Sequence, residues 1–141
     1  MNSVPQLTRI MHVDDARDIR DVVRLALETL GGFTIESCES GDAAVAKASA
    51  FGPELLLLDD MMPGMDGPAT FRRLRQMPEL KNTPVLFMTA QAMPEDIARL
   101  EALGAMAVIP KPFDPLTLAD RVRMLWARGR AESGDPKADR P

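Results

Sequence analysis

Short apolar runs alternate with longer amphipathic segments along this chain. Arg9–Val13 is the first apolar run, and it ends in two aspartates. From Ala16 to Leu30, apolar side chains recur at steps of three and four residues, with charged side chains between them. This spacing predicts an amphipathic helix, and Gly31-Gly32 is typical of a helix end.

The same alternation repeats through the rest of the chain. Further strands are predicted at 33–38, 55–58, 85–88 and 106–109. Further helices are predicted at 42–50, 68–77, 94–103 and 114–127. Ser40 or Asp42 caps the first of these helices. Because the loops are short, the pattern predicts a parallel sheet with helices on both faces, and an unbroken run of leucines suits a strand that is covered on both sides.

Composition narrows the class of protein. The chain has 141 residues, of which 45% are apolar, which is enough for one domain with its own core. Its net charge of −4 argues against an extended nucleic-acid-binding surface. No segment resembles a signal peptide or a membrane span, and a single cysteine cannot form an intramolecular disulfide. We therefore expect a soluble cytoplasmic protein with an N-terminal extension (1–8), one domain (9–127) and a flexible C-terminal tail (128–141).

Polar side chains stand at the ends of four predicted strands. They are Asp14, Asp15, Asp59, Asp60, Thr89 and Lys111. In open parallel sheets, ligands bind beyond the carboxyl ends of the strands. If the first and third strands are neighbours, at least three carboxylates converge, and their repulsion drives one of them to take up a proton. A divalent cation would relieve this conflict, and oxygen ligands without histidine or cysteine favour Mg²⁺, or Mn²⁺, over zinc.

The same arrangement suits phosphoryl transfer. A carboxylate beside Mg²⁺ can attack phosphorus and form an aspartyl phosphate. Mg²⁺, the Lys111 ammonium and the Thr89 hydroxyl could each hold one phosphoryl oxygen, because this chemistry depends on charge neutralisation. Each acid alone is equally well explained as a strand end or a helix cap, but the set in register with Thr89 and Lys111 favours function.

Four segments together resemble the receiver domain of two-component response regulators. They are Val13–Asp15, Leu58–Gly67, Pro84–Ala90 and Gly104–Phe113. The resemblance extends over Arg9–Ala127, which is nearly the whole of the expected domain. It implies a flavodoxin-like, doubly wound α/β fold with five helices and a five-stranded parallel sheet in the order 2-1-3-4-5.

The resemblance implies roles for the acids. The phosphorylated aspartate of the family lies four residues before a loop proline, here Pro63, and this selects Asp59 as the phosphoacceptor. Asp59 also belongs to the implied metal site, which Asp15 joins directly and Asp14 largely through water. The backbone carbonyl of Met61 is the remaining implied ligand.

Thr89 matches the switch hydroxyl of the family and Lys111 its phosphate-binding lysine, with a cis peptide expected between Lys111 and Pro112. Two positions depart from the family pattern. The aromatic residue that often reports phosphorylation by swinging inward is replaced by Val108, so any switch must use Thr89 and the loop after it. Asp60, where relatives often carry an apolar or aromatic residue, is expected to be a loop or peripheral acid.

The predicted function is a phosphorylation-dependent signalling receiver. A sensor histidine kinase or a phosphotransfer protein donates a phosphoryl group to Asp59, and phosphorylation changes affinity for a downstream protein. The face that helix 4, strand 5 and helix 5 form is often used for this purpose in the family. We expect no turnover on an external substrate and no direct binding to nucleic acid or membranes. His12 is expected to be a core histidine rather than a phosphocarrier.

Three alternatives remain open at this point. One is a receiver-like interaction module that ignores phosphate, which Val108 supports. Another is a receiver fragment of a hybrid histidine kinase, since the residues after Ala127 are too few for an output domain. The third is a Mg²⁺-dependent phosphatase, which is disfavoured because such enzymes carry a second aspartate two residues after the nucleophile, where Met61 stands.

Overall fold

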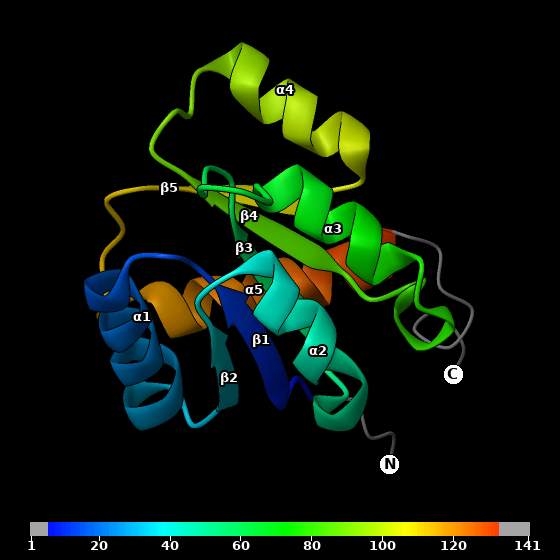
Figure 1. Ribbon diagram of the computed structural model, residues 1–141. Coiled ribbons are helices and arrows are strands. Elements are labelled where there is room, and N and C mark those ends of the chain that lie inside the picture. The colour runs from blue at the N-terminus through cyan, green and yellow to red at the C-terminus, as the bar shows by residue number, and fades with distance from the viewer. Residues whose placement is uncertain (1–5, 133–141) are drawn as a thin grey trace.

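The computed structural model describes residues 6–132, and a five-stranded parallel sheet lies at its centre (Figure 1). The strands are β1 (Arg9–Val13), β2 (Thr34–Cys38), β3 (Leu55–Asp59), β4 (Val85–Thr89) and β5 (Ala107–Pro110). Their order across the sheet is β2-β1-β3-β4-β5. Both the predicted fold class and the strand order implied by the resemblance are therefore confirmed.

Helices cover both faces of the sheet. They are α1 (Arg17–Arg24), the π-helix η1 (Leu25–Leu30) that continues it, α2 (Gly41–Phe51), α3 (Gly67–Arg75), the 3₁₀ turn η2 (Pro78–Leu80), α4 (Pro94–Leu103) and α5 (Leu118–Glu132). Side chains of α1, η1 and α5 pack on one face, and those of α2, α3 and α4 on the other. Figure 1 shows α4 set apart from the other helices, next to β5.

The leucine run of β3 explains why the sheet needs two cores. Leu55 and Leu57 are buried in the cluster under α1 and α5, whereas Leu56 and Leu58 are buried in the cluster under α2, α3 and α4. Successive side chains of a strand point to opposite faces, so a central strand between two helical layers must be apolar at every position. This run fixes the direction in which β3 delivers the residues that follow it.

Local capping follows the sequence signals. The Ser40 hydroxyl accepts a hydrogen bond from the backbone N–H of Ala43 at 3.1 Å, which confirms it as the cap of α2. Asp66 caps α3 in the same way, through the N–H of Ala69 at 2.9 Å. The left-handed backbone that ends α4 is supplied by Gly104, with φ of 119°.

The last helix differs from its predicted bounds at both ends. It was expected over 114–127, but residues 114–117 form a turn, in which the Asp114 carboxylate accepts a hydrogen bond from the N–H of Leu116. The helix then continues to Glu132, so the predicted flexible tail (128–141) is wrong over its first five residues. Gly129 lies inside the helix, where a Cβ would collide with the side chain of Met106. The remainder of the tail, 133–141, and residues 1–5 of the predicted extension lie outside the described residues.

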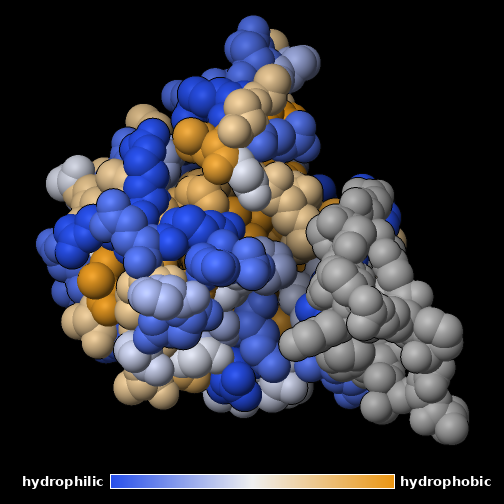
Figure 2. Space-filling model, turned by 90° about the vertical axis from the view of Figure 1, so that its right-hand side faces the viewer, coloured by the Kyte–Doolittle hydropathy of each residue, from blue (hydrophilic) through white to orange (hydrophobic). Residues whose placement is uncertain are grey.

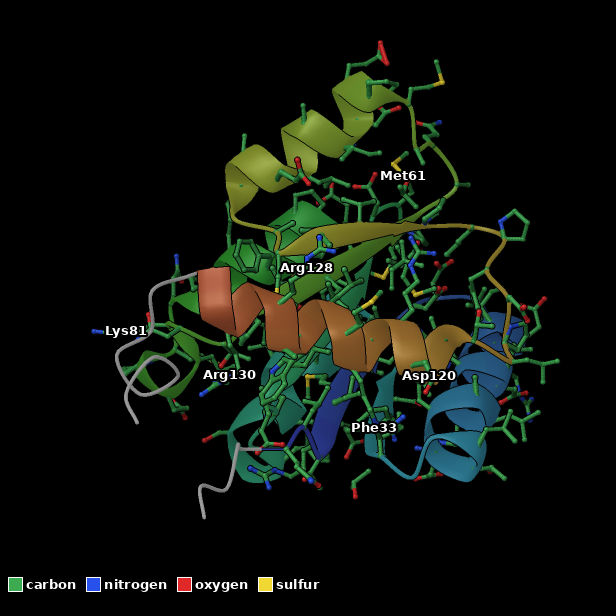
Figure 3. The ribbon with its side chains drawn as sticks, turned by 180° about the vertical axis from the view of Figure 1, so that it is seen from behind. Phe33, Met61, Lys81, Asp120, Arg128 and Arg130 are labelled. Atoms are coloured by element: carbon green, nitrogen blue, oxygen red, sulfur yellow. The ribbon has the colours of Figure 1, made fainter. Side chains whose placement is uncertain are left out.

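One face of the described surface is mainly polar. Figure 2 shows the face at the right of Figure 1, where hydrophilic residues dominate and apolar ones form scattered patches. Over residues 6–132, every helix is too short or too polar to cross a membrane. Figure 3 shows the molecule from behind the view of Figure 1, where α5 crosses the strands with Arg128 and Arg130 on its last turns.

Candidate functional site

The carboxyl ends of β1 and β3 bring three acids together. Val13 and Leu58 are paired in the sheet, so the residues that follow them leave the two strands side by side. Asp14, Asp15 and Asp59 each offer an oxygen, and these oxygens all lie within 4.8 Å of one another. Asp14 and Asp59 are only 1% and 5% exposed, whereas Asp15 is open to solvent. The predicted convergence of the first and third strand ends is thus confirmed.

Lys111 lies between two of these acids. Its Nζ donates to Asp59 Oδ1 at 2.8 Å and to Asp14 Oδ2 at 3.0 Å. The backbone fixes this position, because the N–H of Lys111 donates to the carbonyl oxygen of Thr89 at 2.8 Å. The peptide bond between Lys111 and Pro112 is cis, as expected. One ammonium group therefore partly neutralises a pair of buried carboxylates.

The pKa values of Asp59 and Lys111 reflect the burial and the close approach of these charged groups. Burial raises the pKa of the Asp59 carboxyl, the hydrogen bond from Lys111 lowers it, and the Asp14 charge raises it again, with a net rise. Burial would lower the pKa of Lys111, but its hydrogen bonds to Asp59 and Asp14 outweigh this and raise it. The three acids of the cluster together carry more negative charge than the single ammonium group of Lys111 can neutralise. A cation among these oxygens would relieve the excess, and an all-oxygen donor set suits a hard divalent ion.

A second cluster forms on the other side of the same strand ends. Asp60 follows β3 in the loop, as one of the two expectations had it, but it is 1% exposed, so the expectation of a peripheral acid was wrong. Its Oδ2 accepts hydrogen bonds from Arg99 Nη2 of α4 at 3.1 Å and from the Thr89 hydroxyl at 3.3 Å. The N–H of Gln91 donates to Thr89 Oγ1 at 3.0 Å. Sequence reasoning missed Arg99, and the only available signal was that a buried acid after a central strand requires a cation.

The loop after β3 leaves the sheet abruptly. Met61 follows two residues behind Asp59 with its side chain 62% exposed, and Figure 3 shows it below α4. The N–H of Gly67 donates to the carbonyl oxygen of Asp60 at 2.9 Å, which brings the start of α3 back against the strand end. A Cβ at Gly67 would collide with the carbonyl oxygen of Asp59, so the close return requires glycine.

Comparison with known proteins decides the family. The family model described as the response regulator receiver domain matches residues 10–123 of this sequence. These residues include every side chain of the two clusters. The chain belongs to the response regulator receiver domain family. The receiver is 38% identical over 128 residues to the transcriptional regulatory protein ResD of Bacillus subtilis, a match that covers 89% of this chain and 51% of ResD. It is 34% identical over 126 residues to PhoB, the phosphate regulon transcriptional regulatory protein of Rhizobium meliloti, covering 89% and 55% respectively.

Solved structures agree with this assignment. The chemotaxis protein CheY4 of Vibrio cholerae superposes with a TM-score of 0.78 at 30% identity, over 84% of this chain and 98% of that one. The signal receiver domain of a DNA-binding response regulator from Colwellia psychrerythraea superposes with a TM-score of 0.75 at 27% identity, over 84% and 98%. This receiver spans about half the length of the curated relatives that it matches.

Membership in the family carries a function. The chain is a phosphorylation-dependent signalling receiver of two-component systems, and receivers interact with histidine kinases or phosphotransfer proteins. They bind a divalent metal through an acidic cluster, which in this receiver is Asp14, Asp15 and Asp59.

Two other residues of the receiver behave as the sequence suggests. Val108 pairs with Phe87 across β5 and β4 and packs against the core under α4, so an aliphatic side chain occupies the position that is often aromatic. His12 is fully buried in β1, and burial, with the charges of Lys111 and Arg20, lowers its pKa to about 3. The prediction of a core histidine is confirmed, because this imidazole is enclosed and neutral.

Proposed function

We propose that Asp59 accepts the phosphoryl group, and that Asp14, Asp15 and Asp59, with the backbone carbonyl of Met61, hold Mg²⁺ beside it, or Mn²⁺ in its place. The observation that carries the proposal is the contact of Lys111 Nζ with both Asp59, at 2.8 Å, and Asp14, at 3.0 Å. A nearly buried carboxylate with a raised pKa, next to a fixed ammonium group and two further acids, has the properties of a metal-assisted nucleophile. The metal supplies positive charge that lowers the repulsion between Asp59 and an incoming phosphoryl group.

In the proposed transfer, an oxygen of Asp59 forms a bond to phosphorus while the bond from phosphorus to a histidine nitrogen of the donor breaks. The nitrogen keeps the electron pair of that bond and takes up a proton from water. Lys111 orients the attacking carboxylate before transfer and pairs with a phosphoryl oxygen afterwards. Thr89, at the end of the neighbouring strand, donates a hydrogen bond from its hydroxyl to another phosphoryl oxygen. The receiver assists its own phosphorylation and dephosphorylation and has no external substrate.

The proposed donor is a sensor histidine kinase or a phosphotransfer protein, and the proposed output is a change in affinity for a downstream protein. The surface formed by α4, β5 and α5 suits this output, since α4 follows the loop that begins after Thr89. Met93, the residue before α4, is 62% exposed, and a flexible thioether fits an adaptable protein contact.

Intact-mass measurement with acetyl phosphate tests the phosphoacceptor. The wild type should gain one phosphoryl group in the presence of Mg²⁺ and none in the presence of excess chelator, because the acids need the cation to tolerate the donor's charge. Asp59→Asn should abolish the gain. Asp42→Asn is the matched control, since Asp42 is an exposed acid in the first turn of α2, and this variant should label as the wild type does. Labelling of Asp59→Asn at the wild-type level refutes the assignment.

A second candidate rests on Val108. An aliphatic side chain at this position provides no aromatic ring to report phosphorylation, which favours a receiver-like module that binds its partner regardless of phosphate. Hydrogen exchange before and after stoichiometric phosphorylation separates the two functions. Unchanged protection throughout residues 6–132 supports the phosphate-independent module, and altered protection in the β4–α4 region supports the switch.

A further inference from the structure

Asp59 and Asp60 are consecutive, yet their side chains lie on different faces of the sheet. Leu58 and Phe87 point to the core under α4, so alternation along β3 and β4 sends Asp60 and Thr89 to that same face. Alternation sends Asp59 to the face of Leu57, together with Lys111. The second acid is therefore separated from the metal cluster by the strand itself.

Asp60 accepts hydrogen bonds from two side chains that belong to different elements of the receiver, Thr89 of β4 and Arg99 of α4. Its Oδ2 accepts from Thr89 Oγ1 at 3.3 Å and from Arg99 Nη2 at 3.1 Å. Burial of a carboxylate is tolerated only when hydrogen bonds and opposite charge compensate for the lost water. One oxygen thus links the end of β4 to helix α4.

Helix α4 has few other attachments to the sheet. Leu100 is its only fully buried residue, and Arg99 stands directly before it. The Arg99 side chain is 46% exposed, so its guanidinium reaches from solvent into the buried Asp60 carboxylate. The ion pair and the Leu100 contact together fix this turn of the helix, which makes the position of α4 sensitive to the state of Asp60.

We propose that Asp60 is a positioning residue that holds the Thr89 hydroxyl in the unphosphorylated receiver and, through Arg99, couples the release of that hydroxyl to α4. The inference rests on the proposed phosphoacceptor Asp59. The Thr89 hydroxyl lies 3.3 Å from Asp60 Oδ2 and 3.3 Å from the carbonyl oxygen of Gln91. A hydroxyl has one proton, so donation to a phosphoryl oxygen leaves neither of these acceptors with it. Phosphorylation then leaves Asp60 with Arg99 as its sole side-chain partner among those described.

This arrangement supplies the switch that Val108 does not. In the absence of an inward-swinging aromatic ring, the change at Thr89 needs another route to the α4 surface. The bond that Thr89 gives up is made to the same oxygen that Arg99 holds, so the ion pair and the turn of α4 around it adjust directly. The route from the phosphoryl group to α4 contains three side chains, Thr89, Asp60 and Arg99.

Beryllofluoride with Mg²⁺, a non-covalent mimic of the phosphoryl group, measures the competition for Thr89. Asp60→Asn keeps the shape of the side chain and removes its charge, so Thr89 is held less tightly. We expect beryllofluoride to bind about threefold to tenfold more tightly, which corresponds to the loss of one charge-assisted hydrogen bond. Asp60→Leu, which removes the acceptor, should act in the same direction, and both variants are checked for folding by circular dichroism.

A double-mutant cycle separates positioning from simple charge repulsion. In a Thr89→Val background, Asp60→Asn should have no effect on beryllofluoride affinity, because the hydroxyl through which Asp60 acts is absent. An equal gain in both backgrounds means that Asp60 acts by its charge alone and overturns the proposal, as does the absence of any gain in the wild-type background. If the wild type itself does not bind beryllofluoride or accept phosphate, the proposed function fails and the inference with it.

Hydrogen exchange tests the connection to α4. Beryllofluoride should alter the protection of residues 94–103 in the wild type, and Arg99→Gln should reduce this response while beryllofluoride still binds. Glu101→Gln is the matched control, because Glu101 is an exposed charge on the same helix that lacks the contact with Asp60, and its response should equal that of the wild type. An undiminished response in Arg99→Gln overturns the coupling.

Discussion

Lys111→Met isolates the electrostatic role of Lys111 from its packing. Methionine retains most of the aliphatic stem and removes the ammonium group that contacts Asp59 and Asp14. The carboxylate oxygens of these acids lie within 4.8 Å of each other. Charges about 5 Å apart repel by about 3 kcal/mol at an effective dielectric constant of about 20, and removing one partner of a buried ion pair typically costs about 3–5 kcal/mol. We expect a loss of about 3 kcal/mol in the free energy of unfolding at pH 7 without metal, or roughly 10 °C in Tm.

The loss should depend on pH in a defined direction. Asp59 already has a raised pKa, so its charged form is less favourable in the folded protein than in the unfolded chain. A group of this kind favours folding below its unfolded pKa, about 3.8, and that advantage disappears as pH rises through the higher folded value. Removing Lys111 raises the folded pKa further. The destabilisation should therefore be largest at neutral pH and decrease at acid pH, as Asp59 takes up a proton.

Mg²⁺ should replace the missing charge. A ligand that binds only the folded state at one hundred times its Kd stabilises by about 2.7 kcal/mol, which would recover most of the expected loss. Thermal unfolding at pH 4 and pH 7, with and without Mg²⁺, measures both dependences. Lys47→Met is the matched control, since Lys47 is half exposed and its 3.6 Å contact with Glu36 is worth less than about 1 kcal/mol. Equal destabilisation at both pH values, or no recovery with Mg²⁺, would show that the loss arises from packing and refute the electrostatic explanation.

Two further predictions concern the cores. His12 is the sole histidine of the chain and has a pKa of about 3, so its imidazole signals in an NMR titration should stay those of the neutral ring down to the pH of unfolding; titration near pH 6.5 contradicts the enclosed ring. Gly129→Ala should not bring the gain of about 1 kcal/mol that alanine normally gives over glycine in a helix interior, as measured by denaturant unfolding, because its Cβ would displace the side chain of Met106. The same change combined with Met106→Ala should cost less than the sum of the two, and strict additivity refutes the contact.

Elements whose pattern is local could be predicted from the sequence. The strand predicted at 55–58, observed as Leu55–Asp59, followed from an unbroken apolar run, and the cap at Ser40 from a polar side chain just before a helix. The strand order came from the family resemblance rather than from periodicity, because nothing in an apolar run states which neighbour it pairs with. The convergence of Asp14 and Asp59 then followed from that order.

Features that depend on distant contacts could not be predicted. Gly129 has a low helix propensity, yet α5 continues through it to Glu132, and the side chain of Met106 occupies the space that a Cβ at this position would need. The widening of the first helix into a π-helix over Leu25–Leu30 has no signal in the spacing of its apolar residues. Asp60 was expected at the periphery because its cation, Arg99, lies 39 residues later in the chain.

Two adjacent carboxylates at the end of a buried strand are tolerable because the strand directs them apart. Asp59 is compensated by Lys111, which follows β5, and Asp60 by Arg99, which belongs to α4. Each acid therefore has a cation from a different element, and the two ion pairs lie on opposite faces of the sheet. The Thr89 hydroxyl, at the end of the strand next to Asp59, is the group that can bond on either side. In the switch that we propose, a phosphoryl group on Asp59 competes for that hydroxyl, so a charge added on one face of the sheet changes the hydrogen bonding of a buried acid on the other.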